Sequence, residues 1–141
     1  MMFLLDTNVL SAMMSPAPSP EVAAWIAAQR MDDLFTAAVC QAEILSSLSI
    51  MPEGRRRDTL AAAARAMFEE DFEGRVLPFD AVAASAYAEI FAMRRLAGRA
   101  TATLDLMIAA IARAHGAGVV TRDRGGFEGC GLTVVDPWSV G

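Results

Sequence analysis

The stretch Met1-Met2-Phe3-Leu4-Leu5-Asp6-Thr7-Asn8-Val9-Leu10 decides the fold. Its apolar run is too short for a helix, and it ends at an acid and two small polar residues. This pattern predicts a buried strand of a parallel sheet, with Asp6 at the carboxyl end, where open α/β sheets bind ligands. The same polar residues also suit the N-cap of a following helix. The stretch alone therefore leaves both interpretations of Asp6 open.

The chain has 141 residues, 55% of them hydrophobic, which predicts a single domain over 1–141. No apolar segment reaches the length of a membrane span. The opening run is shorter than the core of a secretion signal and has no basic residues before it, so we expect a cytoplasmic protein without membrane contact. Cys40 and Cys130 lie far apart and outside any metal-ligand spacing, which predicts two reduced thiols.

The formal net charge of −5 argues, taken alone, against a nucleic-acid partner. All 12 basic residues are arginines, however, and several cluster at 55–57, 94–99 and 122–124. Guanidinium groups suit phosphate, whereas arginine clusters on exposed helix faces are usually only solvated. The overall charge therefore does not decide the partner.

Helical and extended patterns alternate along the chain. Helices are expected at 9–14, 21–29, 37–50, 55–72, 81–96 and 103–114, and further strands at 34–36, 75–78, 119–121 and 132–135. Such alternation is typical of an α/β fold with parallel strands and right-handed crossovers.

Three more acids occupy positions that suit either structure or chemistry. Glu43 falls within the helix 37–50, among small residues on an expected packing face, where an unpaired charge is costly. Asp105 lies in the first turn of an otherwise apolar helix, where the helix dipole favours an anion. Asp123 follows an apolar run, as Asp6 does, although a turn residue explains it equally well.

The four acids make chemical sense as one site. In a parallel sheet with right-handed crossovers, Asp6 and Asp123 face the same crevice, and the helices that carry Glu43 and Asp105 can close over it. Carboxylates a few ångströms apart repel by several kcal/mol per pair at an effective dielectric of about 20. A hard divalent cation relieves this repulsion, and all-oxygen ligation favours Mg²⁺ or Mn²⁺.

An ordered set of short motifs resembles the PIN-domain ribonucleases, and especially the toxins of VapBC-type toxin–antitoxin pairs and the FitB-like proteins. The motifs are Leu5-Asp6-Thr7-Asn8-Val9-Leu10, Ala42-Glu43-Ile44, Asp105 ahead of Ile108-Ala109-Ala110-Ile111-Ala112, Thr121-Arg122-Asp123, Phe127-Glu128-Gly129 and Asp136-Pro137-Trp138. The resemblance runs nearly from end to end.

This resemblance implies a three-layer α/β PIN-like domain with a parallel four- or five-stranded sheet between helices. It also implies a Mg²⁺- or Mn²⁺-dependent endoribonuclease that acts as the toxin of a type II toxin–antitoxin system. The residues that match the family's metal-binding and catalytic acids are Asp6, Glu43, Asp105 and Asp123. Thr121 matches a frequent polar supporter, and Asn8 is expected to orient Asp6 through a hydrogen bond.

The implied partners are an RNA substrate, a small antitoxin and a second copy of the chain in a homodimer. We expect Arg122 and Arg124, or the cluster 94–99, to bind phosphates that flank the cleaved bond. The antitoxin is expected to cover an apolar groove and to send a basic side chain into the acidic pocket.

Two departures from the family pattern leave an alternative. Gly126 stands where many relatives carry another acid, and Cys40 stands where many carry Thr or Ser. A catalytically silent PIN-fold protein or RNA-binding module is therefore the alternative. A phosphoryl-transfer receiver domain also uses acids at strand ends, but it needs a late lysine, and this chain has no lysine.

Overall fold

The computed structural model describes residues 1–139. A parallel sheet forms its centre, built from β1 (Phe3–Leu5), β2 (Leu34–Ala37), β3 (Val76–Leu77), β4 (Gly118–Val120) and β5 (Val134–Val135). The strand order is β3-β2-β1-β4-β5. The α/β fold expected from the sequence is confirmed, with five strands among the described residues.

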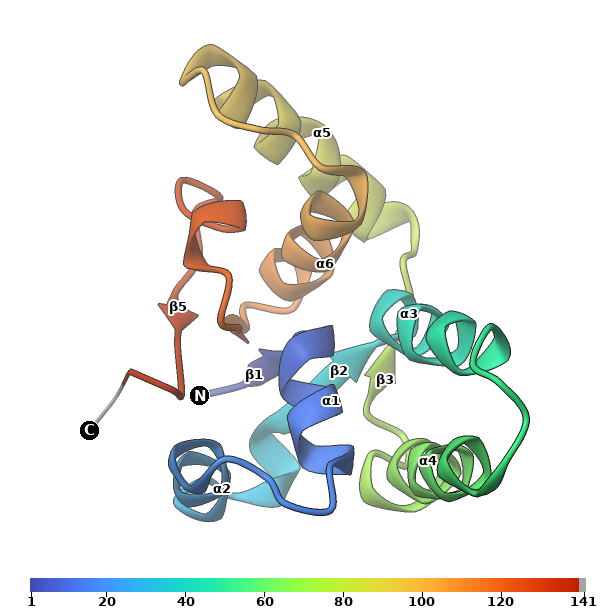
Figure 1. Cartoon of the computed structure of the whole chain (residues 1–141). Helices are drawn as coiled ribbons and strands as arrows, with labels where there is room; N and C mark the ends of the chain where they lie inside the picture. The colour runs from blue at the N-terminus through green and yellow to red at the C-terminus, as the bar shows by residue number, and fades with distance from the viewer. Residues whose placement is uncertain (140–141) are drawn as a thin grey trace.

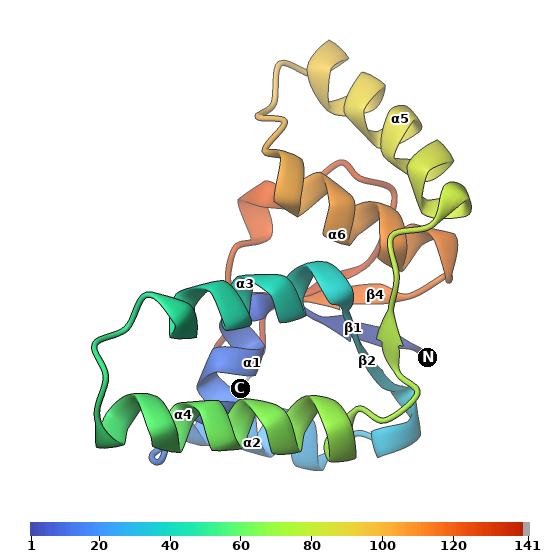
Figure 2. The same ribbon diagram turned by 90° about the vertical axis from the view of Figure 1, so that its right-hand side faces the viewer.

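In the described part of the chain, six α-helices surround the sheet: α1 (Thr7–Met14), α2 (Pro20–Ala27), α3 (Ala38–Ser49), α4 (Arg55–Ala66), α5 (Ala81–Leu96) and α6 (Thr103–Ala114). Shorter helical segments are η1 (Met31–Asp33), η2 (Met67–Asp71), which continues α4 as a π-turn, and η3 (Arg124–Gly126). The helices α5 and α6 lie on one side of the sheet, and α2 and α4 lie on the other (Figure 1). In Figure 2, α5 crosses over α6 on the side away from the strands.

The central strand β1 sets the position of the site. Leu4 and Leu5 are fully buried, because β1 pairs with β2 on one edge and with β4 on the other. The chain first runs outward from β1 to β2 and β3, and later returns to place β4 on the opposite edge of β1. The carboxyl ends of β1 and β4 therefore meet where the strand order reverses, which is the usual ligand position in open α/β sheets.

Helix α6 forms the apolar wall next to this point. Its residues Ile108, Ala109, Ala110, Ile111 and Ala112 are buried, as the continuous apolar pattern predicts. His115 is the C-cap of this helix, which accounts for it without a chemical role.

The prediction of which face of the helix at 37–50 packs against the core is wrong. In α3 the buried side chains are those at Val39, Cys40, Ile44 and Leu48, whereas Ala42, Ser46, Ser47 and Ile50 are exposed. The i, i+4 spacing from Cys40 to Leu48 makes the larger apolar surface, so that side turns toward the core. Glu43 consequently lies at the border of the buried face and is half-buried.

Both cysteines are buried and unpaired, so the expectation of two free thiols is confirmed. Within residues 1–139, none of the helices combines the length and the apolar character needed to cross a bilayer.

Candidate active site

Asp6 begins the site, directly after the last residue of β1. Its carboxylate is the N-cap of α1 and accepts a hydrogen bond from the Thr7 backbone N–H at 2.7 Å. The other carboxylate oxygen accepts from the Thr121 hydroxyl at 2.8 Å. The side chain is buried, with 6% of the residue exposed. Asp6 is thus both the helix cap and the most deeply buried acid of the cluster, so the two interpretations of its role are compatible.

Thr121, just past the end of β4, is the hub of the hydrogen bonds around Asp6. Its fully buried hydroxyl donates to Asp6 and accepts from Asn8 Nδ2 at 3.1 Å and from the Asp123 backbone N–H at 3.0 Å. Asn8 Oδ1 accepts from the Arg122 N–H at 3.2 Å. Asn8 therefore reaches Asp6 through Thr121 rather than by a direct hydrogen bond.

Glu43 joins the cluster from α3. The Thr7 hydroxyl donates to Glu43 Oε1 at 2.8 Å, so Thr7 contacts Asp6 with its backbone and Glu43 with its side chain. The Asp6 and Glu43 oxygens and the Cys40 sulfur offer ligand atoms that all lie within 4.8 Å of one another. From the sequence, Thr7 was expected only as a possible cap; its place directly after Asp6, at the start of α1, is the signal that could have identified its role.

Asp105 and Asp123 approach each other at η3. A methyl group built on Gly126 would lie 2.8 Å from Asp105 Oδ2 and 2.9 Å from Asp123 Oδ2, so both carboxylates border the same small space. The Gly126 N–H also donates to Asp123 Oδ1 at 3.3 Å. At Gly126 the chain therefore presents backbone that the carboxylates of Asp105 and Asp123 closely surround.

The four acids influence one another electrostatically. Burial raises the pKa of Asp6 to about 6, and the charges of Asp105 and Glu43 add to this shift, while hydrogen bonds from Thr121 and Thr7 oppose it. Partial burial raises the pKa of Asp105, followed by the charges of Asp123 and Glu43, and Arg94 partly offsets this. The structure thus places the predicted acids in two pairs, Asp6 with Glu43 and Asp105 with Asp123, and the charges of Asp105 and Glu43 connect the pairs.

The chemistry of this cluster fits a hard divalent cation. It offers several carboxylate oxygens, whose mutual repulsion a cation would relieve. The one sulfur in reach does not suit such an ion, because burial and the charge of Asp6 raise the pKa of the Cys40 thiol to about 12 and keep it protonated. Mg²⁺ and Mn²⁺ are the ions that prefer an all-oxygen donor set of this kind.

The arginines near the site differ in accessibility. The Arg122 guanidinium lies over the Trp138 ring, 4.9 Å from its centroid, and Arg124 is exposed on η3. Arg99 pairs with Glu128 at 3.3 Å. Arg94 is buried, so the expectation that it binds substrate phosphates is wrong: its guanidinium already bonds to backbone carbonyls.

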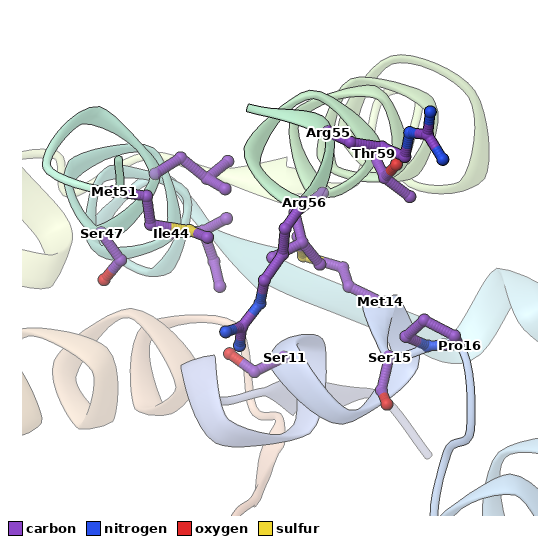
Figure 3. Close-up of a pocket in the computed structure, with 12 residues that line it drawn as sticks. Ser11, Met14, Ser15, Pro16, Ile44, Ser47, Met51, Arg55, Arg56 and Thr59 are labelled. Atoms are coloured by element: carbon purple, nitrogen blue, oxygen red, sulfur yellow. The ribbon is translucent and has the colours of Figure 1, made fainter. Parts of the chain in front are cut away.

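A groove of about 690 Å³ opens between α1, α3 and α4 (Figure 3). Met14, Ile44 and Met51 contribute apolar surface, and Arg56 extends from α4 toward the groove. Ile44 directly follows Glu43 in α3, but none of the four acids lines the groove.

Fold and site together define a parallel α/β protein with a cluster of acids at the point where the strand order reverses. The chain belongs to the PIN domain family, which matches residues 3–129. It is 39% identical to the VapC ribonuclease Y4jK of Sinorhizobium fredii, over 97% of this chain and 98% of that protein. It is 34% identical to Toxin FitB of Neisseria gonorrhoeae, over 97% of this chain and 99% of that protein. The crystal structure of FitAcB from Neisseria gonorrhoeae superimposes with a TM-score of 0.87 at 32% identity, covering 99% of this chain and all of that one.

Proposed function

We propose that this protein is an endoribonuclease that depends on Mg²⁺ or Mn²⁺ and acts as the toxin of a type II toxin–antitoxin pair. The observation that carries the proposal is the arrangement of two pairs of acids, Asp6 with Glu43 and Asp105 with Asp123, from four separate segments of the chain, with charges that act across the two pairs. Such a coupled cluster is costly for stability alone and is typical of phosphodiester chemistry with a bound cation. The names of the relatives, a VapC ribonuclease and a toxin, support the same function.

The four acids would hold the cation, which supplies Lewis acidity toward the phosphodiester and its attacking water. Thr7 and Thr121 fix the Asp6 carboxylate from both of its oxygens, so it needs no reorientation when a cation binds. Glu43 and Asp123 are more exposed than Asp6, and we assign to one of them the acceptance of a proton from the attacking water.

RNA recognition is assigned to Arg122 and Arg124. Arg122 is stacked on Trp138 and exposed, and its backbone lies between Thr121 and Asp123. A guanidinium held flat on a tryptophan can bind a phosphate at its edge or stack a base on its open face. These contacts would bring an anionic substrate to a site whose acids require a cation.

The groove between α1, α3 and α4 is the surface that we assign to the antitoxin. Its apolar floor suits the apolar face of an amphipathic helix, and a basic side chain of the antitoxin would extend beyond Ile44 toward Glu43. Such a partner would block the RNA site and the cation site together.

Incubation of the purified protein with a panel of RNAs in Mn²⁺ or Mg²⁺ tests the enzymatic activity. We expect cleavage by the wild type, a loss of at least two orders of magnitude in D105N, and no change in D32N, an exposed acid outside the cluster. RNA binding by the wild type without cleavage would favour the silent binding module instead.

Thermal unfolding tests the cation site separately. Mn²⁺ binds the folded protein and should raise the melting temperature of the wild type and of D32N, because the ion relieves repulsion among the acids. The D6N variant should lose this shift. A wild type that does not respond to Mn²⁺ or Mg²⁺ would contradict the proposed site.

A further inference from the structure

Arg94 lies near the carboxyl end of α5 and is only 2% exposed. A guanidinium carries five N–H donors and no acceptor, and its burial is costly unless those donors find partners. Here Nε donates to the Ala100 carbonyl at 2.7 Å, and the two terminal nitrogens donate to the carbonyls of Glu128 at 2.6 Å and of Gly125 at 3.3 Å. The guanidinium is therefore held by backbone, not by a carboxylate.

One of these carbonyls connects Arg94 to the acidic cluster. The peptide between Gly125 and Gly126 accepts from Arg94 through its C=O and donates through its N–H to Asp123 Oδ1. Two hydrogen bonds on one peptide unit polarise each other, and both become stronger. A single peptide thus links the buried cation to a carboxylate of the site.

The same peptide also determines the space between two acids. The Cα of Gly126 faces Asp105 and Asp123 so closely that an added methyl group would meet both carboxylates at less than 3 Å. Ala100, whose carbonyl also accepts a hydrogen bond from Arg94, lies in the loop that leads into α6. Helix α6 carries Asp105. Arg94 consequently holds both segments that carry this half of the cluster.

We propose that Arg94 is a positioning residue for the cation site: its guanidinium holds the Gly125–Gly126 peptide against Asp105 and Asp123 and so sets the separation of the two carboxylates. The proposal rests on the proposed function, since it concerns the same acids. It assigns Arg94 an effect on cation affinity and turnover and no direct contact with RNA.

The first test measures Mn²⁺ affinity by electron paramagnetic resonance, without RNA, for the wild type, R94K and R94Q. Loss of a residue that orients metal ligands typically weakens metal binding by 10- to 100-fold, and we expect a loss of about 10-fold or more in both variants. Lysine keeps the charge but cannot bond three carbonyls at once. The matched control is R113Q, which removes an arginine of α6 that pairs with Glu89 of α5 at 3.0 Å, and it should bind Mn²⁺ like the wild type.

A double-mutant cycle separates positioning from general stability. If Arg94 acts through the peptide that binds Asp123, R94K should weaken Mn²⁺ binding much less in a D123N background than in the wild type. With saturating Mn²⁺, R94K should lower kcat for RNA cleavage and leave KM unchanged.

Each outcome decides the proposal. A folded R94K or R94Q protein with wild-type Mn²⁺ affinity would overturn it, and so would equal effects of R94K in both backgrounds. If R94Q does not fold, R94K decides; an R94K variant that also fails to fold would make Arg94 a general stabiliser and overturn the proposal. A wild type whose Mn²⁺ affinity depends on Arg94 but which cleaves no RNA would sustain this inference while refuting the proposed function.

Discussion

Asp6 shows how two opposing effects act on one carboxylate. The hydrogen bonds from Thr7 and Thr121 favour its charged form, whereas burial and the neighbouring acids disfavour it. Burial is the larger effect, and the pKa rises from 3.8 to about 6. Near neutral pH the protein therefore holds an ionised acid in an unfavourable environment, and it recovers the cost when a cation binds.

The raised pKa gives the stability of the cation-free protein a defined pH dependence. The folded state binds the Asp6 proton more tightly than the unfolded state, so this contribution is fully present below pH 4 and is lost as the pH rises through 6. A shift of this size corresponds to about 3 kcal/mol. We expect the stability of the wild type, relative to D6N, to fall by that order between pH 4 and pH 7.

Denaturant unfolding in chelator at several pH values measures this difference, and subtraction of D6N removes the contributions of other groups. Saturating Mg²⁺ at pH 7 should restore the wild-type stability. A difference between wild type and D6N that does not vary with pH would show that Asp6 ionises as freely in the folded protein as in the unfolded one.

Thr121 is the residue on which the orientation of Asp6 depends most. The substitution T121V keeps the shape but removes a donor to Asp6 and an acceptor for Asn8 and for the Asp123 N–H. Buried polar groups without partners cost about 1–3 kcal/mol, so we expect that loss of stability together with weaker Mn²⁺ binding.

The matched control is T36V, a fully buried threonine whose hydroxyl donates to the Leu5 carbonyl at 2.9 Å. It should lose stability to a similar extent with little change in Mn²⁺ affinity. Calorimetric titration of the two variants compares them directly, and equal Mn²⁺ affinities would argue against a role of Thr121 in orienting Asp6.

At the scale of elements, η3 is the segment that brings Asp123 to Asp105. We expect G126A to push the two carboxylates apart, because its methyl group would lie within 3 Å of both. The carboxylates end flexible side chains, so the fold should persist while Mn²⁺ affinity and RNA cleavage decrease several-fold.

Gly125 supplies the control for this element. A methyl group there would meet only Asp123 Oδ1, at 3.9 Å, which is an ordinary contact. G125A should therefore retain cation binding, and a comparison of Mn²⁺ affinities separates a local clash from a general effect of alanine in η3. Equal behaviour of the two variants would contradict the steric argument.

Most elements could be predicted from the sequence because their patterns are strong and local. The apolar run with Asp105 in its first turn predicted α6 with the bounds 103–114, and Asp80, the kind of residue that favours an N-cap, caps α5 by accepting from the Ala83 N–H at 3.0 Å. The prediction of the buried face of α3 was wrong, because several small residues fit either side of that helix. Which side is buried depends on contacts with the sheet, and no local pattern contains them.

At the scale of the whole molecule, α5 carries an apolar face that residues 1–139 leave uncovered. Val82, Met93 and Leu96 are 63%, 41% and 89% exposed, and they share one side of the helix because 11 and 14 residues are close to three and four turns. Leu104 at the start of α6 is 47% exposed. These residues are candidates for the interface of the homodimer that the sequence led us to expect.

Sedimentation equilibrium tests this assignment. We expect a mass of twice 15.0 kDa for the wild type and a shift toward the monomer for L96E, because a charge on that face opposes burial of the interface. V22A, which changes a buried residue of α2, should keep the wild-type mass. A monomeric wild type at high concentration would contradict the homodimer.

Asp6, Asp105 and Asp123 could be picked out from the sequence because each follows a strand or lies in the first turn of a helix, whereas Glu43 lies within α3 and had no such end to mark it. The residues that support them were harder to predict. From the sequence, Thr7 could be interpreted only as a possible cap. Arg94 could be interpreted only as one arginine of a cluster, because a sequence does not show which arginine of a cluster is buried. Its role depends on carbonyls of loops 6 and 34 positions away.

The hydrogen bond between Asp6 and Thr121 joins residues that are 115 positions apart. During translation Asp6 leaves the ribosome long before β4 is synthesised, and it has no buried partner until then. A chain that stops early cannot assemble the cluster. A nascent chain therefore lacks the complete set of acids until Asp123 has been synthesised, and products truncated before that residue would lack the cation site.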